Sequence, residues 1–404
     1  MANLIIKQSM DLTEKINLMQ QDALFDVSDG NAIYVPDLTS IKNEIKSKST
    51  LPPLPKMMLS NDCIFNCAYC RLRAGRDNND RYTNSPKETA EISVKMAKAS
   101  RQGVFISSAI CKNANHTGEL ILETLRIIRH EHRYTGFIHA KVMPGTDPEL
   151  IRQTSFYANR MSVNIEVAKS EGYAQIARNK SKEKIIPPMR QICDLVKTAQ
   201  DYRSANYRHS PFAASSQATQ IMAGSTNEMD YEILRLSKAL YQKYKMKRVY
   251  YTPFHYSGNA KGYNDLPETA TPVWRMKRLY QADRLMEIYG FTPEEIAPES
   301  APNLMYEFDP KAAWAIRNIH LYPVEVNKAD YEMLIRIPGI GTTFAKRIVK
   351  ARRSINITHD ALKKLGVSLK RCQHFITCNG VFIGEKSENI DIYKRLLANP
   401  LTDK

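Results

Sequence analysis

Apolar, strand-like runs alternate with helix-like runs between Leu51 and about Tyr256. One helix-like run begins at Ser85-Pro86-Lys87-Glu88, a capping sequence with proline at the first helical position, and ends near Gly103. Strands that alternate with helices predict a parallel α/β sheet. Six such units suggest an open, partial (β/α)6 barrel. The predicted strands are Lys56–Ser60, Val104–Ser108, Gly136–Val142, Met161–Val167, Thr219–Ala223 and Arg248–Phe254.

The pattern changes outside this region. Near the N-terminus, a short helical pattern over Asp11–Gln21 is followed by polar sequence. Near the other end, the helical runs Lys328–Ile337 and Thr342–Arg352 flank a short segment with proline and glycine. A stretch rich in proline and acidic residues precedes these two runs. We therefore expect an N-terminal extension (1–50), a barrel (51–290), a linker (291–320) and an all-α domain (321–404).

The composition is that of an ordinary globular chain except for its charge. Of the 404 residues, 43% are hydrophobic and 25% are charged, but the net charge is +16, which favours a polyanionic partner. Ten Lys or Arg and a single acid, Asp360, lie between residues 336 and 371, so this segment carries +9. No apolar run approaches the roughly 20 residues that span a bilayer. We expect a protein with no membrane partner, located in the cytoplasm, or in the host cytoplasm if it is viral.

Three cysteines follow the first predicted strand with the spacing C-x3-C-x2-C: Cys63, Cys67 and Cys70. Thiols at this spacing can bind three corners of a [4Fe–4S] cluster and leave the fourth iron without a protein ligand. Zinc is the alternative, but a zinc site usually takes four ligands, often as two separated pairs, and no second C-x2-C occurs in the chain. The remaining cysteines show no cluster spacing: Cys111, Cys193, Cys372 and Cys378.

With Tyr69 before the last cysteine, C-x3-C-x-aromatic-C resembles the signature of radical S-adenosylmethionine (SAM) enzymes. From about Leu54 to Phe382, the chain is similar to the radical SAM proteins that carry a C-terminal helix-hairpin-helix module and are described as DNA modification or repair enzymes. The resemblance implies a partial radical SAM barrel, a [4Fe–4S] cluster whose open iron binds SAM, and an electron donor such as flavodoxin or ferredoxin.

Residues at other strand ends are expected to contact SAM, because reactive groups gather at the C-terminal ends of parallel strands. Radical SAM enzymes usually carry glycines after the second strand, and this chain has Ser107-Ser108-Ala109 there instead. The fourth strand ends in Asn164-Ile165-Glu166, whose polar side chains need partners if the strand is buried. The alternative is a structural hydrogen bond. The predicted cofactor contacts are Tyr69, Ser107, Ser108, Asn164 and Glu166.

The segment Ile337-Pro338-Gly339-Ile340-Gly341 joins the two C-terminal helical runs. Its glycines permit a tight turn whose N–H groups lie at the start of a helix, an arrangement suited to a phosphate. A weaker repeat covers Thr358–Phe375, and the pair resembles the tandem helix-hairpin-helix of DNA repair proteins, which hold the duplex backbone without reading sequence. The alternative is a basic helical pair used for packing. The predicted nucleic-acid-binding residues are Pro338, Gly339, Ile340, Gly341, Lys346 and Arg347.

These features together predict an enzyme that uses a [4Fe–4S] cluster and SAM to abstract a hydrogen atom from a base in DNA. The outcome would be modification of the base, including a radical isomerisation in thymidine hypermodification, or repair of a lesion. Two alternatives stay open: a radical SAM enzyme that modifies tRNA, and a non-catalytic iron–sulfur protein that binds DNA and senses redox state.

Overall fold

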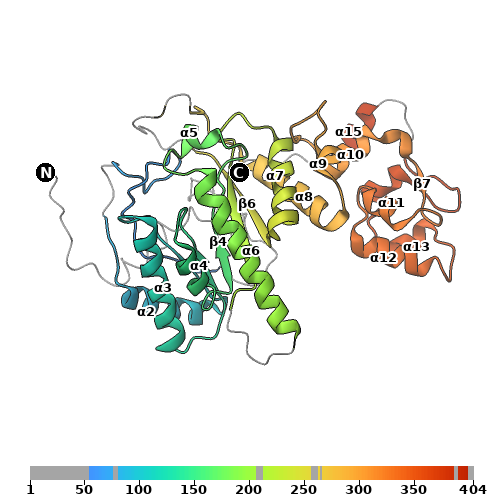
Figure 1. The fold of residues 1–404 in the computed structure, drawn as a ribbon. Coiled ribbons are helices and arrows are strands. Elements are labelled where there is room, and N and C mark those ends of the chain that lie inside the picture. Colours follow the sequence, from blue (N-terminus) through green and yellow to red (C-terminus); the bar gives the residue numbers. More distant parts are fainter. Residues whose placement is uncertain are drawn as a thin grey trace. The chain divides into compact units, whose positions relative to one another are not determined.

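A computed structural model describes residues 54–75, 81–205, 213–255, 263, 266–385 and 390–398 (Figure 1). The predicted N-terminal extension, with its helix over Asp11–Gln21, lies outside the described residues. The chain divides into two compact units, one made of residues 1–228 and 239–273 with the last residue, the other of residues 229–238 and 274–403. The second unit therefore includes the predicted linker, 291–320.

All six predicted strands are present, and they form one parallel sheet in the first unit. Neighbouring strands pair in chain order from the first to the sixth. This sequential order is that of a barrel and differs from a doubly wound sheet, in which the order reverses. The first and last strands do not pair with each other among the described residues, so the prediction of an open, partial (β/α)6 barrel is confirmed. The strands are β1 (Lys56–Met58), β2 (Val104–Ser107), β3 (Ile138–Lys141), β4 (Arg160–Ser162), β5 (Ser216–Ala223) and β6 (Arg248–Pro253).

Helices connect successive strands, and α2, α3, α4 and α6 lie side by side along the outside of the sheet (Figure 1). Right-handed crossovers place successive helices on one face when the strand order is sequential. The first helix begins as predicted, because Ser85 Oγ accepts from the amide of Glu88 at 3.2 Å and Pro86 is the first helical residue. The helices are α2 (Pro86–Ser100), α3 (Ala114–His130), α4 (Pro148–Thr154), α5 (Gly172–Ile176), α6 (Lys182–Ser204) and α7 (Asp230–Tyr244).

The fourth strand is shorter than the apolar run predicted. It ends at Ser162, and the chain pairs with β5 again at Glu166, whose amide donates to Gln220 O at 2.9 Å and whose carbonyl accepts from Met222 N at 2.7 Å. Glu166 has φ +63°, a conformation that interrupts a regular strand. Asn164 and Glu166 therefore lie beyond the strand, at the edge where its carboxyl end meets the cavity described below.

The second unit is helical, as predicted, with one addition. Two-residue strands, β7 (Val324–Glu325) and β8 (Ile376–Thr377), pair in parallel, so the domain is not strictly all-α. The Glu325 carboxylate links them by accepting from Thr377 Oγ1 at 3.0 Å. No helix among the described residues is long and apolar enough to cross a membrane. The helices are α8 (Val273–Tyr289), α9 (Pro293–Ile296), α10 (Pro310–Arg317), α11 (Tyr331–Arg336), α12 (Thr342–Ala351), α13 (His359–Lys364), α14 (Leu369–Cys372) and α15 (Ile390–Leu397).

Candidate functional site

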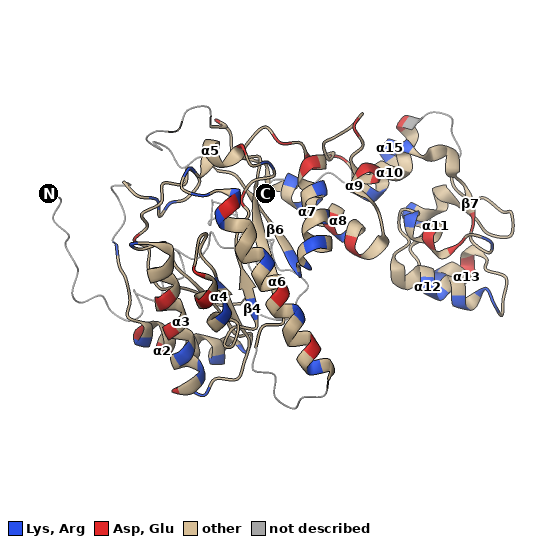
Figure 2. Cartoon of the chain, viewed as in Figure 1, with Lys and Arg blue, Asp and Glu red and all other residues tan. Residues whose placement is uncertain are grey.

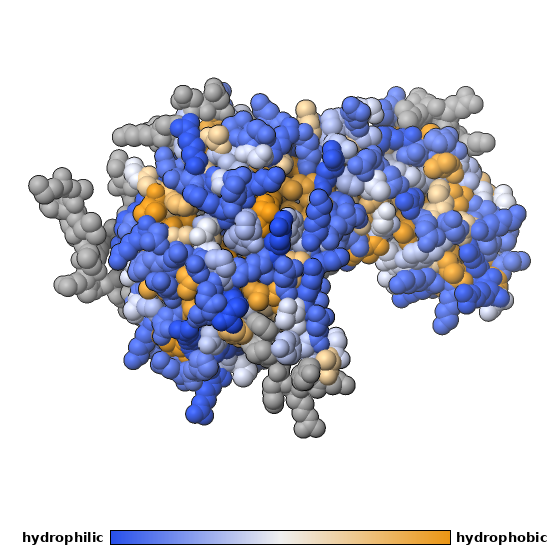
Figure 3. All heavy atoms as spheres, in the orientation of Figure 1, coloured by the Kyte–Doolittle hydropathy of each residue, from blue (hydrophilic) through white to orange (hydrophobic). Residues whose placement is uncertain are grey.

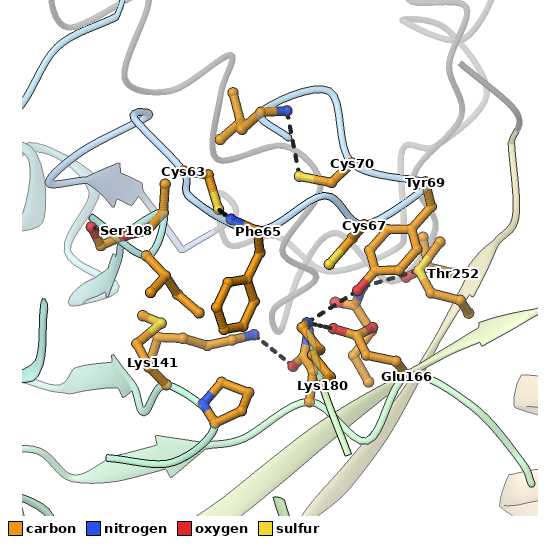
Figure 4. A pocket seen from close by; sticks show the side chains of 18 of the residues that line it. Cys63, Phe65, Cys67, Tyr69, Cys70, Ser108, Lys141, Glu166, Lys180 and Thr252 are labelled. Atoms are coloured by element: carbon orange, nitrogen blue, oxygen red, sulfur yellow. Dashed lines mark hydrogen bonds and ion pairs between the residues drawn. The ribbon is translucent and has the colours of Figure 1, made fainter. Parts of the chain in front are cut away.

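A cavity lies at the C-terminal ends of the barrel strands, beside the loop that follows β1. Its empty volume is about 880 Å³, part of it open to solvent. Cys63, Cys67 and Cys70 all line it. Figure 4 shows the three cysteines along one side of the cavity, with Glu166 and Lys180 across from them. The structure therefore brings the predicted thiols to the edge of the sheet where parallel βα folds bind ligands.

The cysteine loop is held in shape by hydrogen bonds that involve no thiol. The guanidinium of Arg81 donates to the carbonyls of Leu72 and Arg73, each at 2.8 Å. From the other side, the amide of Ala68 donates to Ile176 O at 2.8 Å. These bonds fix the path of the loop, so the positions of the three sulfurs do not depend on a bound metal alone.

The sulfur atoms lie in a mostly buried environment. Backbone amides point at two of them: Phe65 N donates to Cys63 Sγ and Leu72 N to Cys70 Sγ, each at 3.4 Å. Burial raises the pKa of Cys67 to about 11, and it raises the pKa of Cys70 further. Both thiols are therefore protonated at neutral pH until a metal centre displaces the proton. Amide-to-sulfur bonds of this kind stabilise ligating thiolates and tune the potential of an iron–sulfur cluster.

Three cysteines in one loop can supply three ligands of an iron–sulfur cluster and leave one iron open. Among the described residues, no three His, Cys, Asp or Glu side chains converge closely enough to hold a single metal ion. A [4Fe–4S] cluster needs no such convergence, because each thiolate binds a different iron atom. The thiols therefore fit the cluster that the spacing predicted.

Glu166 is the most unusual polar residue of the cavity. Its side chain is 2% exposed, and its Oε1 accepts from Lys180 Nζ at 2.8 Å. Its Oε2 is buried and has no hydrogen-bond partner among the described residues. A positive φ at a non-glycine residue is costly and persists mainly where the surroundings enforce it, often at functional sites. Because buried carboxylate oxygens are normally hydrogen-bonded, Oε2 is suited to accept from a ligand in the cavity.

Lys180 links Glu166 to the aromatic residue of the cysteine motif. Its ammonium also donates to Tyr69 Oη at 3.1 Å. Burial acts to lower the pKa of Lys180, but the Glu166 carboxylate and the neighbouring Cys67 and Cys70 together hold this pKa above its ordinary value. Burial likewise raises the pKa of Tyr69. At neutral pH the cavity therefore presents a charged Lys180 and a neutral Tyr69.

Three more polar side chains complete the cavity wall. Asn164 Oδ1 accepts from Lys141 Nζ at 2.5 Å, and Ser108 Oγ donates to the carbonyl of Ala109 at 2.8 Å. Thr252 Oγ1, on β6, is buried without a hydrogen-bond partner among the described residues. The cavity thus has two buried oxygens, one on Thr252 and one on Glu166, available to a polar ligand.

Sequence reasoning missed Lys141, Lys180 and Thr252. A charged residue at the end of an apolar run was a signal for Lys141, and a hydroxyl near the end of the sixth strand was a weaker signal for Thr252. Lys180 had no signal, because it stands in a polar segment with several other lysines. Only the fold brings it to the cavity.

The two serines predicted to contact SAM differ in their position relative to the cavity. Ser107 is part of β2, is 1% exposed and does not line the cavity, whereas Ser108 does. Adjacent residues of an extended chain project to opposite sides, so the two serines do not share one surface. Cys111 is also absent from the wall: it is buried, and its amide donates to Thr117 Oγ1 at 3.1 Å. Tyr69, Ser108, Asn164 and Glu166 do line the cavity.

The predicted phosphate-binding segment forms the turn between α11 and α12 in the second unit. Ile340 N donates to Ile337 O at 3.1 Å and closes the turn, while the amides of Gly339 and Gly341 donate to no acceptor among the described residues. Gly339 is exposed and has φ +89°, and a Cβ at this position would lie 3.2 Å from Cys372 N. The turn therefore requires glycine, and it presents donors that suit an anion.

Basic side chains surround this turn. Figure 2 shows Lys and Arg along α12, and Figure 3 shows hydrophilic residues covering α12 and α13 on the visible face. Lys346 and Arg347 are both exposed, but Arg347 donates to Leu365 O at 3.0 Å and so ties α12 to the second turn. In that second turn, between α13 and α14, Gly366 has φ +88°. The predicted repeat thus has a comparable turn glycine.

Residues 322–362 match the family model of the helix-hairpin-helix motif. No curated protein sequence is significantly similar to this chain. The solved structures to which it is similar include the FeFe-hydrogenase maturase HydG from Carboxydothermus hydrogenoformans, with 15% identity and a TM-score of 0.42 over 58% of this chain and 51% of that one. A second HydG structure, a maturase of the [FeFe]-hydrogenase, has 10% identity and a TM-score of 0.41 over 78% and 80% of the two chains.

The cobalamin-dependent S-adenosylmethionine radical enzyme OxsB has 10% identity and a TM-score of 0.31, over 46% of this chain and 26% of that one. The chain thus spans about half the length of the first HydG structure and about a quarter of OxsB. Likenesses this remote carry no function over to this chain. The chain pairs a partial (β/α)6 barrel, similar to structures that include a radical SAM enzyme, with a helix-hairpin-helix motif.

Proposed function

We propose that this protein is a radical SAM enzyme that modifies a base in DNA. The observation that carries the proposal is the cavity at the strand ends, where Cys63, Cys67 and Cys70 lie with the unpaired oxygens of Glu166 and Thr252. Such a wall fits a cluster with one open iron together with a small polar ligand. The helix-hairpin-helix motif and the basic charge of residues 336–371 support DNA as the substrate.

Different residues of the cavity hold the cluster and SAM. The three thiols bind three iron atoms, and Glu166 Oε2 and Thr252 Oγ1 hydrogen-bond SAM through its hydroxyl or amino groups. Lys180 orients the Glu166 carboxylate through an ion pair at 2.8 Å. When bound, the cluster and SAM supply reductive cleavage of SAM to a radical that abstracts a hydrogen atom from the substrate, with an electron from a donor such as flavodoxin or ferredoxin. The protein positions the reacting atoms and excludes water.

The second unit holds the substrate by its backbone. The amides of Gly339 and Gly341 bind a phosphate, and Lys346 adds charge next to it. Contacts of this kind position DNA without reading its sequence. The residues of the barrel cavity therefore select the base that reacts. A base must leave the duplex to react there. The reaction class we favour is modification, including isomerisation in thymidine hypermodification, with lesion repair as the other outcome of the same chemistry.

Anaerobic reconstitution of the full-length protein with iron and sulfide tests the proposal. With dithionite and SAM we expect 5′-deoxyadenosine by chromatography. We also expect a new nucleoside by mass spectrometry of DNA, but not of tRNA, after incubation. Modification of tRNA alone would replace the substrate. An iron–sulfur protein that binds DNA but never cleaves SAM would instead be a redox sensor.

A further inference from the structure

A second cavity lies within the helical unit, next to the first turn of the helix-hairpin-helix motif. Its volume is about 470 Å³, so it is large enough for a small ligand. Side chains of α8, the start of α10 and Arg371 of α14 line it together with the turn residues Pro338 and Gly339. Gly339 therefore belongs both to the proposed phosphate-binding turn and to this cavity.

The wall of this cavity is positively charged. Arg284, Lys311 and Arg371 line it with a single acid, Asp309, which pairs with Arg371 at 2.5 Å. Lys311 Nζ donates to the carbonyl of Ile340 in the turn at 2.5 Å. Burial lowers the pKa of Lys311 to about 7, so a nearby anion would stabilise its charged form. The wall is thus suited to a group with negative charge.

The same wall carries two tyrosine rings, Tyr280 and Tyr289. The ammonium of Lys311 lies 5.0 Å from the centre of the Tyr289 ring, and the Tyr289 hydroxyl is 3.3 Å from where a Cβ of Gly341 would lie. Proteins that bind single-stranded nucleic acid combine cations for the backbone with aromatic rings on which bases stack. In this cavity, the cations are therefore suited to the phosphate of a nucleotide and the tyrosine rings to its base.

We propose that this cavity binds one unpaired nucleotide of the DNA strand whose phosphate the turn holds. The inference rests on the proposed function, since it assumes that DNA is bound at Gly339 and Gly341. A base in a duplex is stacked and paired, so only an unpaired one can enter a cavity and stack on a tyrosine. Capture of one base also leaves its complement unpaired, which is the state that chemistry on a base requires.

Fluorescence anisotropy with the full-length protein tests this at one salt concentration. The ligands are a fully paired duplex, the same duplex with one unpaired nucleotide, and the same duplex with an abasic residue at that position. Stacking of one base on an aromatic ring corresponds to roughly 5- to 150-fold in affinity. We expect the protein to prefer the unpaired nucleotide by at least about fivefold, and to lose this preference with the abasic ligand.

Variants of Tyr280 locate the effect. Tyr280→Leu should remove most of the preference and keep the affinity for the paired duplex, whereas Tyr280→Phe should retain both because the ring remains. Lys328→Gln removes one exposed charge outside the cavity and should weaken binding of all three ligands equally.

Three results would overturn the inference. The first is equal affinity of the wild-type protein for paired and unpaired ligands, and the second is an unchanged preference in Tyr280→Leu. The third is that thymidine monophosphate competes with the duplexes for binding while the protein shows no preference among the three duplexes. This result would make the cavity a site for free nucleotides. Paired-duplex binding without the preference overturns this inference alone, whereas loss of all DNA binding overturns the proposed function with it.

Discussion

The barrel cavity and the helix-hairpin-helix turn are both candidate ligand sites, but they use different parts of the chain. In the cavity, buried and half-buried side chains provide the chemical groups: three thiols and the carboxylate of Glu166. In the turn, Gly339 and Gly341 provide backbone amides and no side chain at all. A buried site of fixed side chains suits a small cofactor of definite shape, whereas exposed amides suit a group that repeats along a polymer.

The charged groups of the two regions also differ in their exposure, and therefore in how strongly salt screens them. The Lys180–Glu166 pair is almost fully buried, so salt in solution screens it weakly. Lys346, beside the turn, is exposed, and its interaction with a phosphate weakens as salt is added. Substitutions in the cavity should therefore act on cofactor binding at any ionic strength, and those near the turn should act mainly at low salt.

The largest expected effect is loss of the metal centre. Replacing Cys63, Cys67 or Cys70 with Ala removes one of three iron ligands, so we expect loss of bound iron and sulfide and no SAM cleavage. Cys193→Ala is the matched control, because Cys193 is a buried cysteine of α6 that does not line this cavity. Iron analysis and chromatography of 5′-deoxyadenosine measure both quantities. Turnover retained in any of the three variants would refute the ligand assignment.

The next effect concerns the buried carboxylate. In Glu166→Gln, the Lys180 ammonium loses its charged partner, and the free energy of unfolding should fall by about 3 kcal/mol. SAM should also lose its stabilising effect on thermal unfolding of the reconstituted protein. Glu149→Gln breaks an exposed pair with Arg152 and should change neither quantity. An unaltered SAM-dependent shift in Glu166→Gln would show that Oε2 does not contact the cofactor.

The fold and the grouping of the three cysteines were predictable because their signals are local. The six apolar runs of the sequence correspond to the six strands of the sheet. The three cysteines, which are close together in the sequence, line one cavity. The wall opposite the cysteines was harder, because Lys180 reaches it only through the path of the chain after α5. The sequence also did not separate Ser107 from Ser108. Ser108 lines the cavity and Ser107 does not, because a difference of one residue reverses the side of an extended chain.

In the helical unit, the glycines marked the turn, but the sequence did not indicate what lies behind it. Residues 291–320 were predicted as a linker, yet Asp309 and Lys311 belong to the wall of the second cavity. Within this segment, which is rich in proline and acidic residues, a short helix, α10, begins at Pro310 with Asp309 as its cap. Charge counted along the chain likewise could not separate two exposed cations, Lys346 and Arg347, of which Arg347 donates to a carbonyl.

A smaller effect is expected from filling the turn with a methyl group. Gly339→Ala introduces strain of about 1–2 kcal/mol at positive φ, and its Cβ would crowd Cys372 N, so the turn must shift. We expect DNA affinity to fall roughly tenfold through a lost charge-assisted hydrogen bond, with SAM cleavage in the absence of DNA unchanged. Gly380→Ala is matched in φ, at +76°, but its Cβ meets nothing within 4 Å. Equal loss of DNA affinity in both variants would mean that strain, and not the turn, is responsible.

The smallest effect separates two adjacent cations. Lys346→Gln should lower the slope of log affinity against log salt by about 0.9, the value for one phosphate contact, and leave thermal stability unchanged. Arg347→Gln should lower the slope no more than this, but it also removes the bond to Leu365 O and the contact with the Phe344 ring at 5.5 Å. Its melting temperature should therefore fall while that of Lys346→Gln does not. If Lys346→Gln leaves the salt slope unchanged, the phosphate does not lie beside the first turn of α12, and the basic face of the helical unit contacts DNA elsewhere.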